Sequence, residues 1–385
     1  MKIVYLSGGL VSVYDSQVLA YLDYLVEQSH EVYLLQGYVS ENEKKILKQK
    51  QSTHCGINII WYKSKPVYPF FEFFKEKNIY KAITTIPNYH DAIIHVRSEI
   101  EGYLLKKIAL KNKLNNPILI DIRGVVCEEF KYKIIYASGI RRLLFRLQQK
   151  YMQRCTNYLF SPDNLKIGIT SVSPLINKYI MEHYKNYNHT LFLHPNITSK
   201  QFIYDEKERQ YIRRKYGIEE KDVLAICSTA GNAVWQKDSL VINKLIDLGV
   251  KVINLSKKDP NIKGCVTISV PFSDMPKMLS AADIAILWRD NTFMNNSASP
   301  SKFSEFATMG LYVIHNKSVV VATDYIKATG AGMLVENVDD IKNIPNSEYF
   351  YKNRKEWIIQ GNNKFGINEL GKSYLETYDI IKFSL

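Results

Sequence analysis

The sequence predicts an α/β protein with two doubly wound domains, and three observations support this. Lys2–Leu6 has the apolar character of a buried strand, and a Gly-containing loop, an amphipathic helix near Gln17–Gln28 and the strand His30–Gln36 follow it. The same order begins again at Val223–Ser228. The length of 385 residues is enough for two domains, each with its own core. Strands that alternate with helices in this way form parallel sheets covered on both faces.

Each domain continues with apolar runs that we interpret as strands, separated by helical segments. In the first domain these runs are Asn58–Tyr62, Asp91–Val96, Pro117–Ile122 and Ile167–Ser173. In the second domain they are Lys251–Leu255, Val266–Val270, Ala281–Arg289 and Leu311–His315.

The domain boundaries follow from a segment without regular period. His194–Tyr204 contains Pro, Asn and Ser, which are typical of a linker. We therefore expect a first domain over 1–193, a hinge over 194–204, a second domain over 205–365 and a closing helix over 366–385.

The positive charge is concentrated in the first half of the chain. Residues 1–190 contain 26 Lys and Arg against 16 Asp and Glu, and Phe130–Pro162 contains seven Lys and Arg and no acid. This imbalance predicts an anionic partner, either nucleic acid or a membrane surface. No nucleic-acid-binding motif accompanies the charge, so we favour peripheral contact with an anionic membrane and expect no nucleic acid. No run of 18 apolar residues occurs that would span a membrane.

For two segments of the first domain, more than one environment is compatible with the sequence. Ser138–Leu159 is an amphipathic helix with apolar and basic residues on different sides, and it suits either an anionic bilayer or the flank of a sheet. Pro69–Lys77 (PFFEFFKEK) is strongly aromatic, and we expect it to lie in the core rather than against lipid.

The cysteines argue against a metal site. All five are widely scattered without a C-x-x-C pair, which is typical of a reducing compartment and not of zinc binding. The N-terminal MKIVYLSGG is a strand pattern rather than a signal peptide. We therefore expect a cytoplasmic protein.

Ser297–Gly310 (SASPSKFSEFATMG) has the arrangement that holds a phosphate in open α/β folds. It places a loop of small residues and a short helix between two strands, so that backbone N–H groups and the helix dipole face an anion. Ser299, Pro300 and Ser301 suit a helix start, and Lys302 adds a cation. Glu305, one turn on, suits a ribose hydroxyl. The alternative is a capped helix between buried strands.

This segment resembles the donor-site signature of family 4 glycosyltransferases, which are retaining enzymes of the GT-B fold. Glu305 and Gly310 match the second half of that signature, and Ser297 stands where its first Glu falls. The chain is more similar to a subset with the pattern N-x-x-x-S-P-x-K-x-x-E, which here is formed by Asn295, Ser299, Pro300, Lys302 and Glu305.

A second motif of the resemblance implies further donor-binding residues. The family has Gly-Arg, four residues and Lys-Gly at the diphosphate; Gly231 and Lys237 match, whereas Asn232 stands at the Arg position. Arg289, at the end of a strand, is expected to replace the missing cation. The resemblance places Phe272 against the nucleotide base.

The resemblance also assigns roles in the first domain. Gly8 and Gly9 would lie near the donor phosphate and sugar, although a tight turn between strand and helix would equally explain them. Arg123 stands where the family has a His; it cannot act as a base and would hydrogen-bond the donor sugar or a phosphate oxygen. The alternative is a structural ion pair with Asp121. Glu128 or Glu129 would face the acceptor.

The resemblance implies two Rossmann-like domains facing a cleft, with the C-terminal helix crossing back to the first domain. The activity implied is retaining transfer of a sugar from a nucleoside diphosphate sugar to a saccharide acceptor, expected to be polyprenyl-linked or otherwise lipid-linked, in bacterial capsule, O-antigen or lipopolysaccharide assembly. Arg123, Lys237 and Glu305 would carry the reaction. Protein cations would neutralise the diphosphate, so no metal or other cofactor is expected.

Three alternatives remain open at this point. A nucleotide-sugar epimerase of GT-B fold would convert its substrate without an acceptor. A glycosyltransferase-like binding protein without activity would also fit the departures at Ser297, Asn232 and Arg123. A nucleic-acid-binding protein would explain the charge alone.

Overall fold

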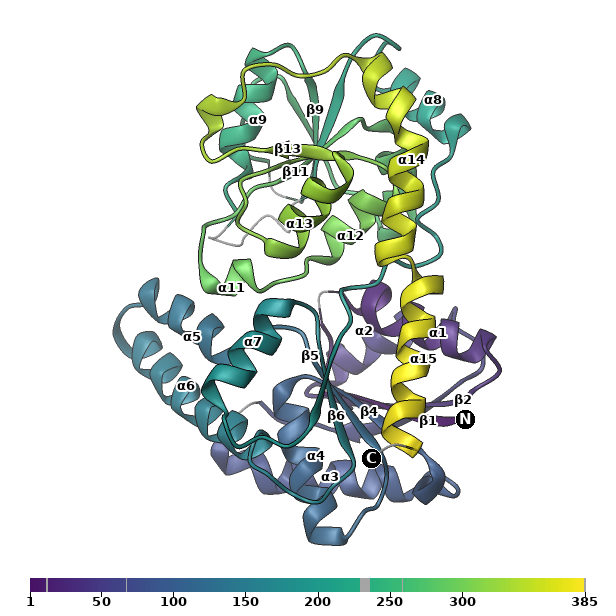
Figure 1. The fold of residues 1–385 in the computed structure, drawn as a ribbon, viewed down its shortest axis with the longest axis vertical. Helices are drawn as coiled ribbons and strands as arrows, with labels where there is room; N and C mark the ends of the chain where they lie inside the picture. The colour runs from purple at the N-terminus through teal and green to yellow at the C-terminus, as the bar shows by residue number, and fades with distance from the viewer. Residues whose placement is uncertain (12, 67, 229–235, 258, 384–385) are drawn as a thin grey trace. The chain divides into compact units, whose positions relative to one another are not determined.

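A computed structural model describes residues 1–11, 13–66, 68–228, 236–257 and 259–383 of the chain. It divides into two compact units. The N-terminal unit comprises Met1–Pro195 together with Gly371–Leu385, and the C-terminal unit comprises Asn196–Leu370. Each unit has its own parallel sheet, and the two are described separately (Figure 1).

The sheet of the N-terminal unit has seven strands in the order β3-β2-β1-β4-β5-β6-β7, all paired in parallel. The strand order reverses between β1 and β4, and such a switch point is where open α/β sheets commonly bind ligands. The strands are β1 (Lys2–Ser7), β2 (Glu31–Tyr38), β3 (Ile57–Lys63), β4 (Ile93–Arg97), β5 (Ile118–Ile122), β6 (Ile167–Ser171) and β7 (Thr190–Leu193).

Helices connect successive strands of this sheet. They are α1 (Ala20–Glu27), which a π-helical turn (Asp15–Leu19) precedes, α2 (Glu41–Gln51), α3 (Glu72–Thr84), α4 (Glu99–Asn112), α5 (Val126–Ile135), α6 (Gly139–Leu159) and α7 (Pro174–His183).

The C-terminal helix α15 (Ile367–Phe383) belongs to the N-terminal unit from Gly371 onward. It packs closely on α1, since a Cβ atom at Gly371 would lie 2.3 Å from the Tyr24 ring. The Tyr21 hydroxyl donates to the Tyr378 hydroxyl at 2.8 Å, and that residue also contacts Nδ1 of His95 at 2.6 Å. The chain end is therefore tied to the first sheet through buried aromatic side chains.

The C-terminal unit repeats the architecture with a six-stranded parallel sheet in the order β10-β9-β8-β11-β12-β13. Its strands are β8 (Leu224–Cys227), β9 (Lys251–Leu255), β10 (Cys265–Ile268), β11 (Ile284–Leu287), β12 (Tyr312–His315) and β13 (Gly332–Leu334). Its helices are α8 (Glu206–Lys215), α9 (Asp238–Asp247), α10 (Met275–Ala281), α11 (Phe293–Asn296), α12 (Ser301–Thr308), α13 (Val320–Thr329) and α14 (Ser347–Phe365).

Both sheets are apolar because they are covered on both faces. The central strands β8 and β11 are buried along their whole length. A buried charge cluster fixes α8 to the start of β11, where the Asp283 carboxylate accepts from Arg209 at 2.8 Å and from Arg213 at 3.2 Å. The predicted fold class, two doubly wound parallel sheets, is confirmed.

One sequence expectation is wrong and another is resolved. The aromatic segment Pro69–Lys77 does not lie in the core, because Phe70, Phe73 and Phe74 are exposed. In the amphipathic helix α6, the buried residues occur from Tyr151 onward. In its first half Ile140, Leu143, Leu144 and Leu147 are exposed, whereas Phe145 is half-buried. No helix in the described ranges is long and apolar enough to cross a membrane.

Candidate functional site

In the C-terminal unit, polar residues gather where β8 and β11 end. Because the strands are parallel and adjacent, Ser228 after β8 and Trp288 and Arg289 after β11 lie at the same edge of the sheet. They enclose a small cavity of about 20 Å³, to which α9 and α12 also contribute. The polar residues that line it are Ser228, Gln236, Asp238, Arg289 and Lys302.

The segment before α9 is joined to the end of β11 by backbone contacts. The Lys237 N–H donates to the Trp288 carbonyl at 3.1 Å, and Gln236 pairs with Arg289 as an antiparallel bridge. Lys237 is the residue before the first turn of α9. The structure thus brings Lys237 and Arg289, two predicted donor-binding cations, to the same place.

Asp238 is the carboxylate of this cavity. Its Oδ1 accepts from the Trp288 N–H at 3.2 Å, which fixes the start of α9 against the end of β11. Burial raises the pKa of Asp238 to about 6, against the opposing effects of its hydrogen bonds and of nearby Arg289 and Lys302. The carboxyl is therefore still mostly ionised at pH 7 and becomes protonated only as the pH falls through about 6.

Arg289 and Lys302 are the cations of the cavity. Burial lowers the pKa of Arg289 to about 10. Burial also lowers the pKa of Lys302, and the nearby Glu305 and Asp238 carboxyls act in the opposite direction on Lys302. Asn316 holds the backbone of Arg289: its Oδ1 accepts from the Arg289 N–H at 3.3 Å, and its Nδ2 donates to the Arg289 carbonyl at 2.6 Å. Two partly buried cations thus line the cavity.

The helix after the predicted anion loop begins as expected from the sequence. Pro300 immediately precedes α12 and Ser301 is its first residue, so the first N–H groups of the helix have no acceptor within it. Ser299 is buried, and its Oγ accepts from the Asn196 N–H at 3.1 Å. Ser304 Oγ donates to the Asn196 carbonyl at 2.8 Å. These bonds position the helix start.

Glu305 lies in the middle of α12 and is only 5% exposed. Burial raises the pKa of Glu305 to about 8, against the effect of Lys302. The carboxyl is therefore predominantly neutral at pH 7 and can donate as well as accept a hydrogen bond.

Asn295 and Phe272 occupy positions with clear structural contacts. Asn295 is buried in α11, and its Nδ2 donates to the Asp290 carbonyl at 2.8 Å, which shapes the loop after β11. Phe272 is half-buried and packs edge-on against Phe202, with ring centroids 5.6 Å apart. Their contact with a donor stays a prediction. Gly231 and Asn232 lie outside the described residues.

In the N-terminal unit, Gly8 and Gly9 follow β1 in a tightly packed loop. A Cβ at Gly8 would lie 2.2 Å from Oε1 of Glu101, and one at Gly37 would lie 2.6 Å from the Gly8 carbonyl oxygen. Glu43 closes the loop by accepting from the Leu10 N–H at 2.8 Å. Close packing alone therefore accounts for a Gly at position 8, and its contact with a donor is untested.

Arg123 forms the ion pair that the sequence offered as an alternative role. Its Nε donates to Oδ2 of Asp121 at 2.6 Å, and its Nη1 donates to Gln17 at 3.2 Å. Burial alone would raise the pKa of Asp121, but Arg123 and His95 hold that pKa far below its usual range. Contact of Arg123 with a donor sugar remains a prediction.

Glu128 and Glu129 lie in the first turn of α5. Glu128 forms an ion pair with Lys131, and burial raises the pKa of Glu129. Beside them lies Glu99, which the sequence analysis missed: its Oε2 accepts from the Val126 N–H at 3.1 Å, and burial raises its pKa to about 8. Its position directly after Arg97-Ser98, at a strand end, is the signal that could have identified it.

Among the described residues, no group of three or more His, Cys, Asp or Glu side chains is arranged to hold a metal ion.

Comparisons with known proteins identify the fold. No protein-family model matches the chain, and no curated protein sequence matches it. Among solved structures, a glycosyltransferase from Rickettsia africae ESF-5 is similar, with a TM-score of 0.66 and 16% identity over 100% of this chain and 99% of that chain. Anabaena Alr3699/HepE in complex with UDP-glucose is similar with a TM-score of 0.66 and 10% identity, over 98% of this chain and 99% of that chain.

A third similar structure is WaaG, a glycosyltransferase involved in lipopolysaccharide biosynthesis. Its TM-score is 0.58 at 12% identity, and the match covers 99% of this chain and 98% of that chain. At such identities the likeness establishes the architecture alone. The chain therefore has the GT-B fold of these glycosyltransferase structures, along essentially its full length.

Proposed function

We propose that the protein is a glycosyltransferase that takes a sugar from a nucleoside diphosphate sugar. The observation that carries the proposal is the cavity at the ends of β8 and β11, where two cations, Arg289 and Lys302, lie beside a single carboxylate, Asp238. The cavity itself has room for about one water molecule, so a diphosphate would bind at its edge, where its charge complements the two cations. The complex of similarly folded HepE with UDP-glucose supports a nucleotide sugar as this ligand.

The cations of the C-terminal unit would act on the leaving group. Breaking the bond between sugar and diphosphate leaves negative charge on the diphosphate and an electron-deficient sugar. Arg289, Lys302 and Lys237, together with the N-terminal end of α12, stabilise the charge that develops on the diphosphate. Because these groups are held in place before the reaction, they need little reorganisation. Protein groups perform this neutralisation, and no metal is part of the proposal.

Glu305 would hold the ribose of the nucleotide. Its neutral carboxyl can accept from one ribose hydroxyl and donate to the other, which a buried carboxylate could not do. The start of α12 brings the phosphate-binding N–H groups within one turn of this carboxyl. Ser299, Pro300 and Ser301 therefore serve the phosphate side of the site and Glu305 the nucleoside side.

The acceptor in this proposal is a saccharide carried on a lipid, at the cytoplasmic face of a bacterial membrane. The basic first half of the chain supports contact with an anionic membrane, and similarity to WaaG supports a role in surface polysaccharide assembly. Transfer would proceed with retention, as the resemblance to family 4 implies. Glu128 or Glu129 would face the acceptor.

A thermal-shift screen of nucleotide sugars with the full chain tests the proposal, followed by a transfer assay with lipid-linked saccharides. We expect stabilisation by one nucleotide sugar and release of its nucleoside diphosphate only when an acceptor is present. Conversion of the nucleotide sugar without acceptor would identify an epimerase instead. Absence of a shift with every nucleotide sugar would contradict the proposal.

A further inference from the structure

We propose that the 3-10 turn Pro69–Phe71, the helix α3 that follows it and the first half of α6 form one docking surface for an anionic lipid bilayer. We call it the bilayer-docking surface; its apolar residues are Phe70, Phe73, Phe74, Ile140, Leu143, Leu144 and Leu147. It adds to the proposed function the surface that would bring the protein to its lipid-linked acceptor. Only the identity of the acceptor rests on the proposed function.

The apolar side chains of this surface are exposed to an unusual degree. Phe70 is 68% exposed and Phe73 is 62% exposed, although aromatic side chains of this size normally lie inside a protein. On α6, Ile140 is 79% exposed and Leu147 is 55% exposed. Large apolar side chains that gather on one face of a protein mark a binding surface.

A buried hydrogen bond joins the two parts of the surface, which are about 70 residues apart in the sequence. The Tyr151 hydroxyl of α6 donates to Oε2 of Glu72 at 3.0 Å, and Glu72 is the first residue of α3. Ile140, Leu144, Leu147 and Tyr151 follow one another at helical spacing on one face of α6. This apolar face therefore extends from the contact with α3 outward along the exposed half of the helix.

Basic residues surround the apolar ones. Arg141, Arg142 and Arg146 are exposed on the same half of α6, and no acid occurs between Phe130 and Pro162. Such a mixture of apolar and basic side chains is what binding at the surface of an anionic bilayer requires.

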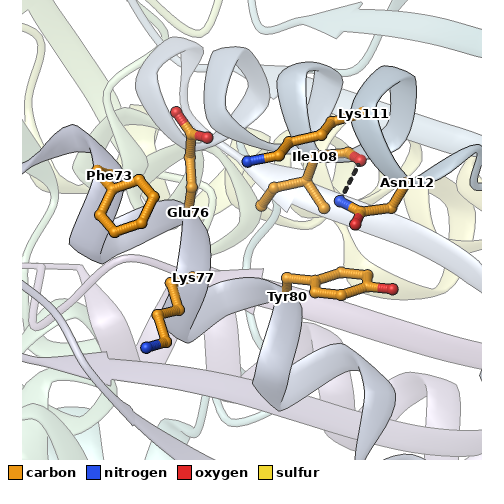
Figure 2. Close-up of a pocket in the computed structure, with 7 residues that line it drawn as sticks. All are labelled: Phe73, Glu76, Lys77, Tyr80, Ile108, Lys111 and Asn112. Atoms are coloured by element: carbon orange, nitrogen blue, oxygen red, sulfur yellow. Dashed lines mark hydrogen bonds between the residues drawn. The ribbon is translucent and has the colours of Figure 1, made fainter.

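A groove between α3 and α4 adds two further cations. It has a volume of about 170 Å³ and is lined by Phe73, Tyr80 and Ile108, with Lys77 on the α3 side and Lys111 on the α4 side (Figure 2). Lys111 Nζ lies 6.0 Å from the centre of the Phe73 ring. The acid in the groove, Glu76, forms an ion pair with Lys107. The groove can therefore receive a lipid phosphate while the aromatic rings enter the bilayer.

The charge distribution favours a bilayer over a second copy of the chain. A symmetric dimer through this surface would bring the same patch from both copies together. The seven Lys and Arg of residues 130–162, with no acid among them, would then face one another and repel. An anionic bilayer instead complements this charge and also accepts the apolar side chains.

Flotation of the full chain with vesicles tests the proposal. The vesicles contain either phosphatidylcholine alone or phosphatidylcholine with about one third phosphatidylglycerol; we expect binding to the anionic vesicles to be at least about tenfold stronger. The combined R141Q, R142Q and R146Q variant should weaken anionic binding by about a hundredfold, because each basic residue near a charged surface contributes about a fivefold factor. The apolar variants F73S/F74S and L144S/L147S should each weaken binding at least about tenfold.

Matched variants in the C-terminal unit control for general effects. Ile203→Ser and Tyr351→Ser remove equally exposed apolar side chains, and Lys342→Gln, Lys352→Gln and Lys355→Gln together remove three exposed charges. These controls should bind vesicles like the parent. Equal loss in surface and control variants would overturn the proposal, as would unchanged binding in the surface variants.

Two further measurements separate the remaining outcomes. If sedimentation shows a dimer that the surface variants dissociate while vesicle binding stays unchanged, the surface is a subunit interface and the bilayer proposal is wrong. Thermal shifts with UDP-glucose and the other nucleotide sugars of the screen, measured on the same variants, monitor the nucleotide-sugar site. Vesicle binding without a shift for any of these sugars would contradict the proposed function and leave the docking surface standing. A shift without vesicle binding would contradict the docking surface and leave the proposed function standing.

Discussion

Two arginines follow central strands of the two sheets, and their surroundings differ. Arg123 comes directly after β5 and is paired with the fully buried Asp121, whose pKa it holds far below the usual range. Arg289 comes after β11, and its carboxyl neighbour Asp238 has a pKa raised to about 6 by burial. Arg123 has a carboxylate of its own, whereas Arg289 and Lys302 share Asp238, so one positive charge at the cavity is left without a counter-charge. We therefore expect Arg123 mainly to stabilise the fold and Arg289 to act on a ligand.

The largest expected effect comes from breaking the buried pair in the N-terminal unit. Asp121→Asn leaves Arg123 buried without its counter-charge, which should lower the free energy of unfolding by about 3–5 kcal/mol. Denaturant unfolding of parent and variant measures this. Adding Arg123→Gln to the variant removes the unpaired charge and should restore part of the stability; a single variant as stable as the parent would show that the pair contributes little.

The second largest effect is expected at Arg289. Arg289→Gln should lower turnover with the nucleotide sugar by about 10²–10³-fold, because a preorganised cation at the developing diphosphate charge is lost. The stability should change much less than with Asp121→Asn. Steady-state kinetics checks the first expectation and denaturant unfolding the second. Unchanged turnover in Arg289→Gln would show that Arg289 does not act on the ligand and that the two arginines do not differ in this respect.

Glu305 should show a pH-dependent contribution to stability. Its pKa is about 8 in the folded protein, above the value of about 4.3 for an unfolded chain. The folded state therefore binds the proton more tightly, and the stabilising effect of this group is present at low pH and is lost as the pH rises through about 8. Glu305→Gln should remove this dependence, so that parent and variant diverge between pH 5 and pH 8.5 in thermal unfolding curves.

Substitutions of Glu305 also distinguish a neutral carboxyl from an ionised one as the group that binds the nucleotide sugar. Gln retains one donor and one acceptor, so Glu305→Gln should keep most of the affinity for the nucleotide sugar, whereas Glu305→Ala should reduce it at least about tenfold. Calorimetric titration compares the two variants. If Glu305→Gln lost as much affinity as Glu305→Ala, the carboxyl would act in its ionised form.

The smallest effect on the site is expected at Lys237. Its backbone contacts the end of β11, but Lys237, unlike Arg289, is not among the residues that line the cavity. Lys237→Ala should lower turnover about tenfold. Lys251→Ala, an exposed lysine at the start of β9, provides the control and should leave turnover unchanged.

The sequence predicted the fold because the strands of both units are buried on both faces. Such strands appear as short apolar runs, and their alternation with helices determines a parallel sheet. The prediction for Pro69–Lys77 was wrong because the aromatic composition of this segment suggested that it lies in the core. The inward face of α3 instead includes Glu72 and Lys75, which are buried through bonds to Tyr151 and Glu101. Partners so far away in the sequence cannot be read from a local pattern.

Part of the candidate site could also be predicted, because it follows from the order of strands and helices. Arg289 follows a strand and Lys302 lies in the first turn of α12, so their meeting at one sheet edge follows from the topology. The bonds from Asn316 that hold Arg289, and the contact of Glu99 with α5, connect separate segments and were not foreseen. Burial also set the pKa values of Asp238 and Glu305, and burial is a property of the folded chain.

The most direct test of the account is calorimetric titration of the full chain with UDP-glucose and with other nucleoside diphosphate sugars, using the parent, Arg289→Gln and Arg123→Gln at matched folded fraction. The account predicts that the parent binds one of these sugars, that Arg289→Gln loses at least about tenfold in affinity, and that Arg123→Gln loses mainly stability. Equal affinity in the parent and in Arg289→Gln, with the loss confined to Arg123→Gln, would contradict it.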